Sequence, residues 1–320
     1  MTFPKMVPRI QFAWWETLIM RGGFAWILFQ EFPRLARLPS LQEAQEGLPF
    51  PNGLAKFFDL SWVLVESNFE ILQMLMLLLA GLYTLGIAFP LVCTGLFVVY
   101  VLPPTLQNSL GSISHYYQMM VLLLLFQALA AWVWTIHNRG LSWRGFILVP
   151  SDLHSFVIRV TMQVLAANYV LCGITKLLNS NFKWVWNSRY MPLQIEKIER
   201  QHYYNRLEVP DMGWGGKVAQ WVIEHPWLCI VFYGPGLIFE LLAFLMLFGR
   251  AWAFWIGVMT LLMHRLILLT MGLNFEQHEI MVLLFMMNIP FWLVFFARKG
   301  AVKAGFLKPD PMQHALTNTK

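Results

Sequence analysis

Residues 119–136 read MMVLLLLFQALAAWVWTI, an apolar run without a charged side chain. A helix needs about 20 mostly apolar residues to cross the hydrocarbon core of a bilayer. One soluble core could not bury many runs of this kind. The stretch therefore predicts a membrane-spanning helix. The fold class follows from the number of similar apolar runs in the chain.

Composition and similar apolar runs extend this prediction to most of the chain. Of the 320 residues, 58% are hydrophobic and only 12% are charged, against roughly a quarter charged in an average soluble domain. The pattern predicts an all-α, polytopic transmembrane bundle of about eight helices. We expect spans near residues 15–32, 60–82, 85–102, 115–136, 156–178, 228–248, 252–270 and 279–297.

The second span has the least typical sequence. Asp59, Glu66 and Glu70 lie in or just before its first half, which favours an interfacial amphipathic helix leading into the membrane. Gly86 and Pro90 then interrupt the apolar run. Because both residues disfavour a continuous helix, we expect two helices here instead of one very long helix.

One long polar segment, residues 179–227, separates the spans. It combines charged residues with many aromatic side chains, and loops of this length are often functional. We expect a long extramembrane loop that acts as a lid or as an interfacial platform; the alternative is a passive connector carrying an aromatic belt. Residues 1–300 would then form a single transmembrane helical domain, followed by a basic polar tail at 301–320.

The distribution of lysine and arginine predicts the orientation and the partners. With eight spans both termini share one side, and most of the basic residues in short loops fall on that side, which is typical of the cytoplasmic face. The lysines and arginines also do not alternate with exposed aromatic residues as a nucleic-acid groove requires. We therefore expect the lipid bilayer as a partner, no nucleic acid, and both termini in the cytoplasm.

Lys176 is the most informative ionisable residue within a predicted span. Tyr169, Gly173 and Lys176 share one helix face at offsets of four and seven residues, and the glycine leaves room for a close neighbour or a ligand. An ammonium group loses hydration in a medium of low dielectric constant, which favours a neutral amine that can act as a base. The alternative is a lysine that snorkels from the helix end to the interface.

Two histidines accompany this lysine as candidates. His264 lies in the middle of a predicted span, beside Arg265, where it could carry a proton, donate a hydrogen bond to a bound polar group, or simply bond a neighbouring helix. His115 opens its predicted helix, where an interfacial role is equally plausible. The histidines are never three to five residues apart, and the three cysteines lack metal-ligand spacing, so we expect no metal site.

Several of these segments, taken in order, resemble the vitamin K-dependent gamma-carboxylase and its bacterial relatives, the horizontally transferred transmembrane (HTTM) domain family. The most specific segment runs from Tyr169 to Leu177 and is similar to that family's Tyr-Phe-x-x-Gly-x-x-Lys-Leu. The segment around His264 is similar to its Phe-His segment. Weaker similarities are Arg21-Gly22-Gly23, Ser114-His115-Tyr116, the pair Arg159 and Gln163, a tryptophan at Trp184 or Trp186, and Met271 to Phe275.

The resemblance implies a membrane enzyme, a lyase that is carboxylase-like or oxygenase-like, using a lipid quinol such as vitamin K hydroquinone. Lys176 would deprotonate the hydroquinone, which then reacts with oxygen and drives proton removal from a substrate, and His264 would polarise a quinone oxygen. The substrate would be a peptide or small molecule reached near residues 179–227, and the setting would be a bacterial inner membrane. The residues implied in cofactor binding are His115, Arg159, Gln163, Tyr169, Gly173, Trp184 and Trp186.

Two departures from the family and two alternative functions stay open. Thr175 stands where the family has a second lysine, and Met263 stands where it has a phenylalanine. One alternative is a non-enzymatic partner in the maturation of, or immunity to, a secreted peptide. The other is a proton-coupled transporter with Arg159, Glu240 and His264 as a relay, against which the lack of an internal repeat counts.

Overall fold

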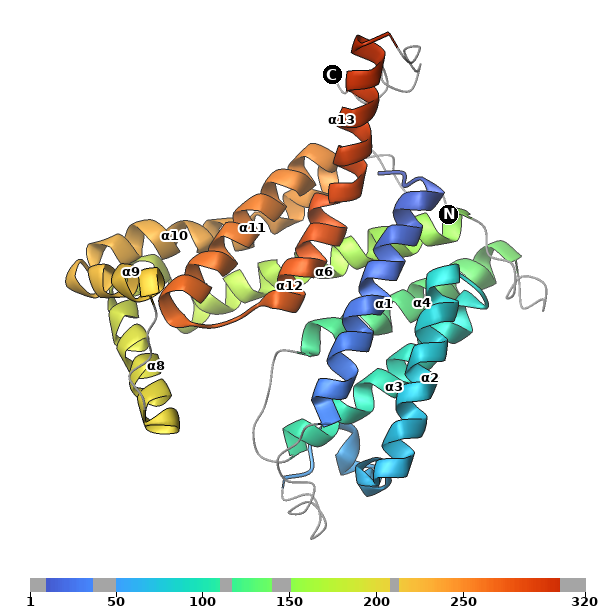
Figure 1. Cartoon of the computed structure of the whole chain (residues 1–320), viewed down its shortest axis with the longest axis horizontal. Helices are drawn as coiled ribbons and strands as arrows, with labels where there is room; N and C mark the ends of the chain where they lie inside the picture. The colour runs from blue at the N-terminus through green and yellow to red at the C-terminus, as the bar shows by residue number, and fades with distance from the viewer. Residues whose placement is uncertain (1–9, 37–49, 110–116, 140–150, 208–212, 306–320) are drawn as a thin grey trace.

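The computed structural model describes residues 10–36, 50–109, 117–139, 151–207 and 213–305, and this part of the chain is all-helical. Figure 1 shows the arrangement. The longest helices are α1 (Trp14–Ala36), α2 (Glu66–Leu85), α3 (Phe89–Ser109), α4 (Gln118–Arg139), α6 (Ser151–Asn179) and α11 (Arg250–Met271). Shorter α-helices are α7 (Trp184–Asn187), α8 (Met191–Arg206), α9 (Gly213–Glu224), α10 (Trp227–Leu241), α12 (Glu276–Met281) and α13 (Ile289–Lys303). The 3-10 helices are η2 (Gly53–Lys56), η3 (Ser61–Leu64), η4 (Ser188–Tyr190) and η5 (Ala243–Phe248), and η6 (Val282–Met287) is a π-helix.

Several helices are long and apolar enough to cross a membrane, as in a multi-pass membrane protein. In the described residues these are α2, α3, α4, α6 and α11, which makes 5, or up to 7 if two bent helix pairs each count as one span. The pairs are α9 with α10, bent by 109°, and α12 and η6 with α13, bent by 44°. The prediction of a helical membrane bundle is therefore confirmed, whereas the count of eight is not.

The predicted span at α1 is not among these helices. This helix is 23 residues long, but it carries four charged residues, Glu16, Arg21, Glu31 and Arg34, which set it apart from the five helices above. Its apolar side chains nevertheless belong to the core: Phe24 and Leu28 are fully buried.

The expected break between the second and third spans is present. Helix α2 ends at Leu85, and Gly86 follows in the left-handed conformation with φ of 76°, which costs least for glycine. Pro90 does not break a helix; it lies in the first turn of α3, where its missing N–H is not needed. Asp59 lies before α2, fully exposed, and accepts a hydrogen bond from the Ser61 N–H that lowers the pKa of its carboxyl group.

Helix α6 connects the two halves of the fold. It contacts α1 and α4 on one side and α10 and η5 on the other, and Figure 1 shows it extending from the α1–α4 group toward α8–α11. The main core lies between α1, α2, α3, η6 and the helices packed against them. It includes Phe24, Tyr83, Phe89 and Phe285. The Lys176 end of α6 thus lies next to α10 and α11.

The segment 179–227 is largely helical where the structure describes it, so the predicted long loop is not confirmed. It contains α7, α8 and α9, and a second small core joins it to α10 and α11. That core consists of Ile195, Ala219, Val222, Cys229, Tyr233 and Met271. Because these buried contacts hold α8 and α9 against the ends of the long helices, the segment is more than a passive connector.

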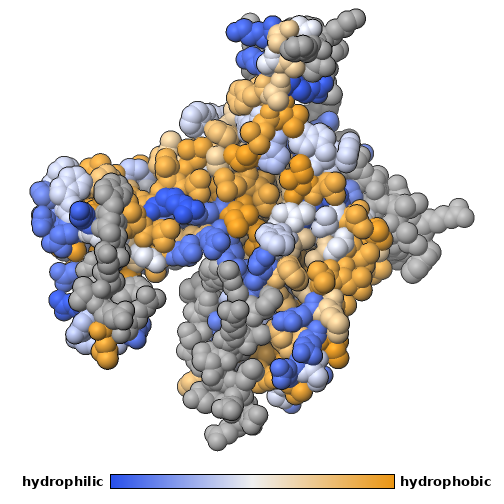
Figure 2. All heavy atoms as spheres, in the orientation of Figure 1, coloured by the Kyte–Doolittle hydropathy of each residue, from blue (hydrophilic) through white to orange (hydrophobic). Residues whose placement is uncertain are grey.

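The outer surface of the bundle is apolar, as contact with lipid requires. Ile71, Met74 and Leu78 on α2 are each more than half exposed, at spacings that place them on one helix face. Figure 2 shows apolar residues over much of this face, hydrophilic residues near the outer ends of α9 and α13, and further hydrophilic patches at the centre and the lower right of the view. The exposed apolar side chains are compatible with contact with lipid.

Candidate functional site

An ion pair lies at the C-terminal end of α6. Lys176 Nζ donates a hydrogen bond to Glu240 Oε1 of α10 at 2.5 Å, and the Lys176 side chain is 33% exposed while that of Glu240 is 6% exposed. The ammonium also lies 5.3 Å from the ring centre of Trp184. The sequence predicted a buried amine in a medium of low dielectric constant; the structure places a carboxylate and an aromatic face beside it.

Gly173 explains how α10 comes this close to α6. A Cβ atom at position 173 would lie 3.0 Å from the Leu241 side chain and 3.3 Å from Glu240 Cβ. These distances are at or below ordinary van der Waals contact, so a larger residue would push α10 away. The close neighbour expected at this glycine is therefore α10, and the glycine sets the distance between Lys176 and Glu240.

An aromatic layer lies beside the ion pair, one to two turns of α6 deeper in the bundle. The ring of Tyr169 is 6.2 Å from that of His264 on α11. The His264 imidazole stacks on Phe275, with ring centres 4.9 Å apart, and its ring centre is 6.3 Å from that of His278 on α12. Helices α6, α11 and α12, the last with Phe275 as its N-cap, thus bring these aromatic rings together.

Several buried polar atoms of this region have no hydrogen-bond partner among the residues that the structure describes. They are the Tyr169 hydroxyl, Glu240 Oε2 and His264 Nδ1. Buried polar groups are almost always paired in folded proteins, and unpaired ones call for an explanation such as a ligand or ordered water. These three atoms on neighbouring side chains are therefore candidates for hydrogen bonds to a bound polar group.

A second charged pair closes the site on the α12 side. Arg265, whose side chain is 61% exposed, forms an ion pair with Glu279, whose side chain is 3% exposed. The amide of Gln277, from the same turn, donates a hydrogen bond to Glu31 of α1. The polar run at the start of the last span therefore fixes α12 to both α11 and α1.

The other residues predicted for the site divide into two groups. Tyr169, Gly173 and Trp184 lie at the Lys176–Glu240 pair, as described above. Trp186 is 56% exposed and lies against Arg189, 4.8 Å from ring centre to guanidinium carbon. His115 lies outside the described residues.

Arg159 and Gln163 are not part of the cluster. Arg159 donates a hydrogen bond to the Ile10 carbonyl at 3.2 Å, and its position is about 25 Å along α6 from Lys176 at a helical rise of about 1.5 Å per residue. Gln163 is exposed. The relay of Arg159, Glu240 and His264 proposed for a transporter is therefore not assembled, because only the last two members lie at this end of α6.

The sequence missed Glu240 as the partner of Lys176 and Glu279 as the partner of Arg265. Glu240 lies in an apolar stretch and Glu279 at the start of the last predicted span, and these positions were a signal, since a buried acid in a span needs a partner. The pairing itself could not be read from one sequence, because 64 residues separate Lys176 from Glu240.

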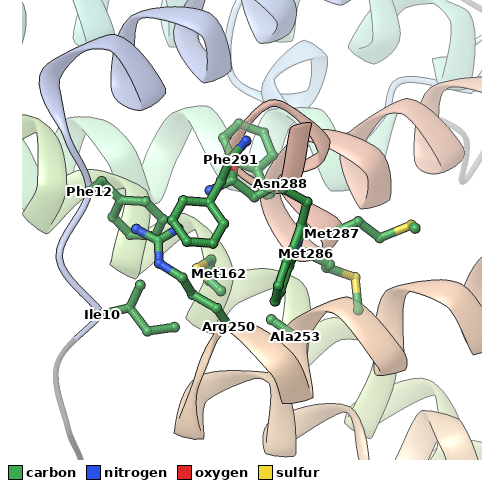
Figure 3. Close-up of a pocket in the computed structure, with 11 residues that line it drawn as sticks. Ile10, Phe12, Met162, Arg250, Ala253, Met286, Met287, Asn288 and Phe291 are labelled. Carbon is green, nitrogen blue, oxygen red and sulfur yellow. The ribbon is translucent and has the colours of Figure 1, made fainter. Parts of the chain in front are cut away.

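A shallow pocket, part of it open to solvent, lies at the opposite end of α11. Figure 3 shows Arg250 reaching toward Phe12 and Phe291 there, and its guanidinium carbon lies 5.1 and 3.9 Å from the two ring centres. The guanidinium donates to Glu16 at 2.7 and 3.1 Å, and Asn288 Nδ2 donates to the same carboxylate at 2.7 Å. Because the charge is already paired, this cluster serves to join α1, α11 and the last span.

Comparisons with known proteins add no relative. No protein-family model, curated protein or solved structure matches the chain. Within the described residues, no group of three or more His, Cys, Asp or Glu side chains could hold a metal ion. The chemistry of the site thus has to be inferred from its side chains.

Proposed function

We propose that the protein is a multi-pass membrane enzyme that uses a lipid hydroquinone, with the Lys176–Glu240 pair as its acid–base group. The observation that carries the proposal is the convergence of this pair with Tyr169 and His264, where three buried polar atoms have no partner. Such a combination of acid–base groups and unsatisfied polar atoms is typical of a catalytic site.

The pair can act as a base through an internal proton transfer. If Nζ passes its proton to Glu240, both charges disappear, and the loss of an ion pair costs little in a medium of low dielectric constant. The neutral amine would then accept a proton from a hydroquinone hydroxyl group, which leaves Lys176 as an ammonium, Glu240 as a neutral carboxylic acid and the hydroquinone as its monoanion beside the ammonium. Glu240 is thus a necessary partner of Lys176 in this mechanism.

The remaining side chains bind and orient the ring. A hydroquinone supplies two hydroxyl oxygens across a flat ring, and it reacts with an oxidant once deprotonated. The Tyr169 hydroxyl and His264 Nδ1 are buried without partners and can bond the second oxygen, while Phe275 holds the imidazole by stacking. These polar atoms would then bond the two oxygens of the ring.

The site is open to molecules that arrive through lipid. Lys176 is one-third exposed, and Ile174 and Leu178, its apolar neighbours on α6, are 39% and 59% exposed. Exposed apolar side chains of a spanning helix face the hydrocarbon. A lipid hydroquinone thus reaches the ammonium laterally, and a peptide or small-molecule substrate approaches from the side of α7–α9.

The test compares cofactor binding and turnover in matched lysine variants. The purified protein is extracted for quinones, which are identified by mass spectrometry, and hydroquinone oxidation is measured in proteoliposomes. Lys176→Met should abolish oxidation, whereas Lys183→Met, at an exposed lysine outside the pair, should keep it. Full oxidation by Lys176→Met would refute the mechanism; a co-purifying peptide without any quinone would instead support the maturation or immunity role.

The membrane topology that accompanies the proposal has eight spans. We place α1 in the membrane because Glu16 is paired with Arg250 and Glu31 with Gln277, and such pairing lowers the cost of ionisable groups within a span. Both termini then lie in the cytoplasm and α7–α9 outside, in a bacterial inner membrane. Reporter fusions after residues 139, 207 and 303 test this, since only the fusion at 207 should report a non-cytoplasmic position.

A further inference from the structure

Helix α8 is packed on one side and exposed on another. Ile195 is completely buried in the small core that α8 shares with α9, α10 and α11. The exposed side, here called the outer face of α8, carries Leu193, Lys197, Arg200 and Tyr204. Leu193 and Tyr204 are 67% and 72% exposed, Arg200 is 74% exposed, and Lys197 is exposed as well. Successive spacings of four, three and four residues place these four side chains in one row along the helix.

The outer face combines apolar and positively charged groups. A leucine and a tyrosine stand at its two ends, and the two basic residues stand between them. Glu196 forms an ion pair with Arg200 at 3.3 Å, but both side chains are well exposed, so this pair is weak. Residues 183–206 as a whole contain five lysines and arginines and two glutamates. A layer that offers hydrocarbon beside negative charge, as anionic phospholipids do, matches such a face.

A lipid-facing surface leads along α6 to the start of α8. Leu171 and Leu178 of α6 are 60% and 59% exposed, and Phe182, just after the end of α6, is 72% exposed. Trp186 and Tyr190 follow, 56% and 52% exposed, and tryptophan and tyrosine gather where a membrane meets water. Helix α8 begins at the residue after Tyr190. Its first turn therefore lies at the edge of the bilayer.

The direction of α8 decides whether the rest of the helix stays at that edge. Figure 1 shows α8 extending away from α9 and α10, across the direction of α11. Leu193 and Tyr204 are about 16 Å apart along the helix at a rise of about 1.5 Å per residue. A helix that continued the direction of the spans would carry Tyr204 that far into water, whereas a helix across them keeps both ends of the outer face at the interface.

We propose that α8 lies along the membrane interface and that its outer face binds anionic phospholipids. Leu193 and Tyr204 enter the boundary between head groups and acyl chains, while Lys197 and Arg200 pair with the lipid phosphates. The planar guanidinium of Arg200 is suited to phosphate oxygens. This role does not depend on the Lys176–Glu240 pair.

The experiment measures the depth of two spin labels in nanodiscs of phosphatidylglycerol or phosphatidylcholine. The full chain carries Cys172→Ser, because Cys172 is exposed whereas Cys93 and Cys229 are buried. One protein then carries Tyr204→Cys, and the matched control carries Asn205→Cys, also exposed but about 100° further around the helix. Collisions of each label with oxygen, which concentrates in lipid, are compared with collisions with a water-soluble nickel chelate. In phosphatidylglycerol the oxygen-to-nickel ratio should be at least about threefold higher at 204 than at 205.

A pair of charge variants tests the preference for anionic lipid. In the protein labelled at 204, Lys197→Gln with Arg200→Gln should lower the ratio at least about twofold in phosphatidylglycerol. Replacing phosphatidylglycerol by phosphatidylcholine should lower it in the same way. Lys299→Gln with Lys303→Gln makes the same change of charge at exposed positions of α13, and it should leave the ratio unchanged.

Each contrary result identifies what is wrong. Equal ratios at 204 and 205 in phosphatidylglycerol place α8 in water and overturn the proposal. Equal ratios in the two lipids, or no effect of the charge variant on α8, overturn the assignment to anionic phospholipid. Dipolar broadening between labels of two copies, or a label shielded only after an acidic peptide is added, would show that the outer face binds protein instead of lipid.

Discussion

Glu240→Leu offers the sharpest test of the ion pair at the centre of the site. The substitution removes the carboxylate and leaves Lys176 Nζ, now without its 2.5 Å partner, beside apolar side chains. Lys176→Met removes the charge on the other side, and the double variant replaces the pair by two apolar groups. Together with the wild type, these three variants form a double-mutant cycle.

The exposure of the two side chains sets the expected size of the effect. Removing one partner of a fully buried pair costs about 3–5 kcal/mol, whereas a surface pair contributes about 0–1 kcal/mol. Glu240 is 6% exposed but Lys176 is 33% exposed, so the ammonium keeps part of its solvation. We therefore expect Glu240→Leu to lower the free energy of unfolding by about 1–3 kcal/mol, and the double variant to recover most of that loss.

The assay is equilibrium unfolding in detergent micelles, followed by helical content. A coupling energy of about 1–2 kcal/mol between the two positions would agree with the contact. If the two single effects add within about 0.5 kcal/mol, the side chains do not interact, and the acid–base pair has no structural basis.

Three further substitutions test other contacts by the same unfolding measurement. Gly173→Val should cost about 1–3 kcal/mol, because its side chain would collide with Leu241 at 3.0 Å; an unchanged value would mean that α10 is not packed on this glycine. Gly86→Ala should cost about 1–3 kcal/mol because of its positive φ, and a neutral result would argue against the left-handed turn. Glu16→Gln should cost about 3–5 kcal/mol, since it leaves Arg250 unpaired, and a loss below about 1 kcal/mol would place that pair in water.

The sequence predicted the helical membrane architecture because the signal is local. Apolar runs such as 119–136 mark spans without knowledge of any neighbour, and Gly86 marked the end of α2 through its own backbone preference. The helices within 179–227 were missed because they carry no such local signal. Polar, aromatic-rich stretches such as α8 have no strong apolar period, and only their packing against α10 and α11 makes them part of the fold.

The candidate site could be predicted only in part. Spacing along one helix placed Tyr169, Gly173 and Lys176 on a common face, and the structure shows that face directed at α10 and α11. The partner Glu240 depends on how α10 packs, which no local pattern encodes. Arg159 was included on resemblance, and its distance along α6 removes it from the cluster.

The most direct measurement is a cryo-EM map of the protein in nanodiscs that contain a lipid hydroquinone. The account predicts density for a flat ring within hydrogen-bonding distance of Lys176 or Glu240, with its far oxygen near Tyr169 and His264. The proposed hydroquinone site would be contradicted by a map in which side chains or lipid tails fill this position although the nanodiscs are saturated with the hydroquinone.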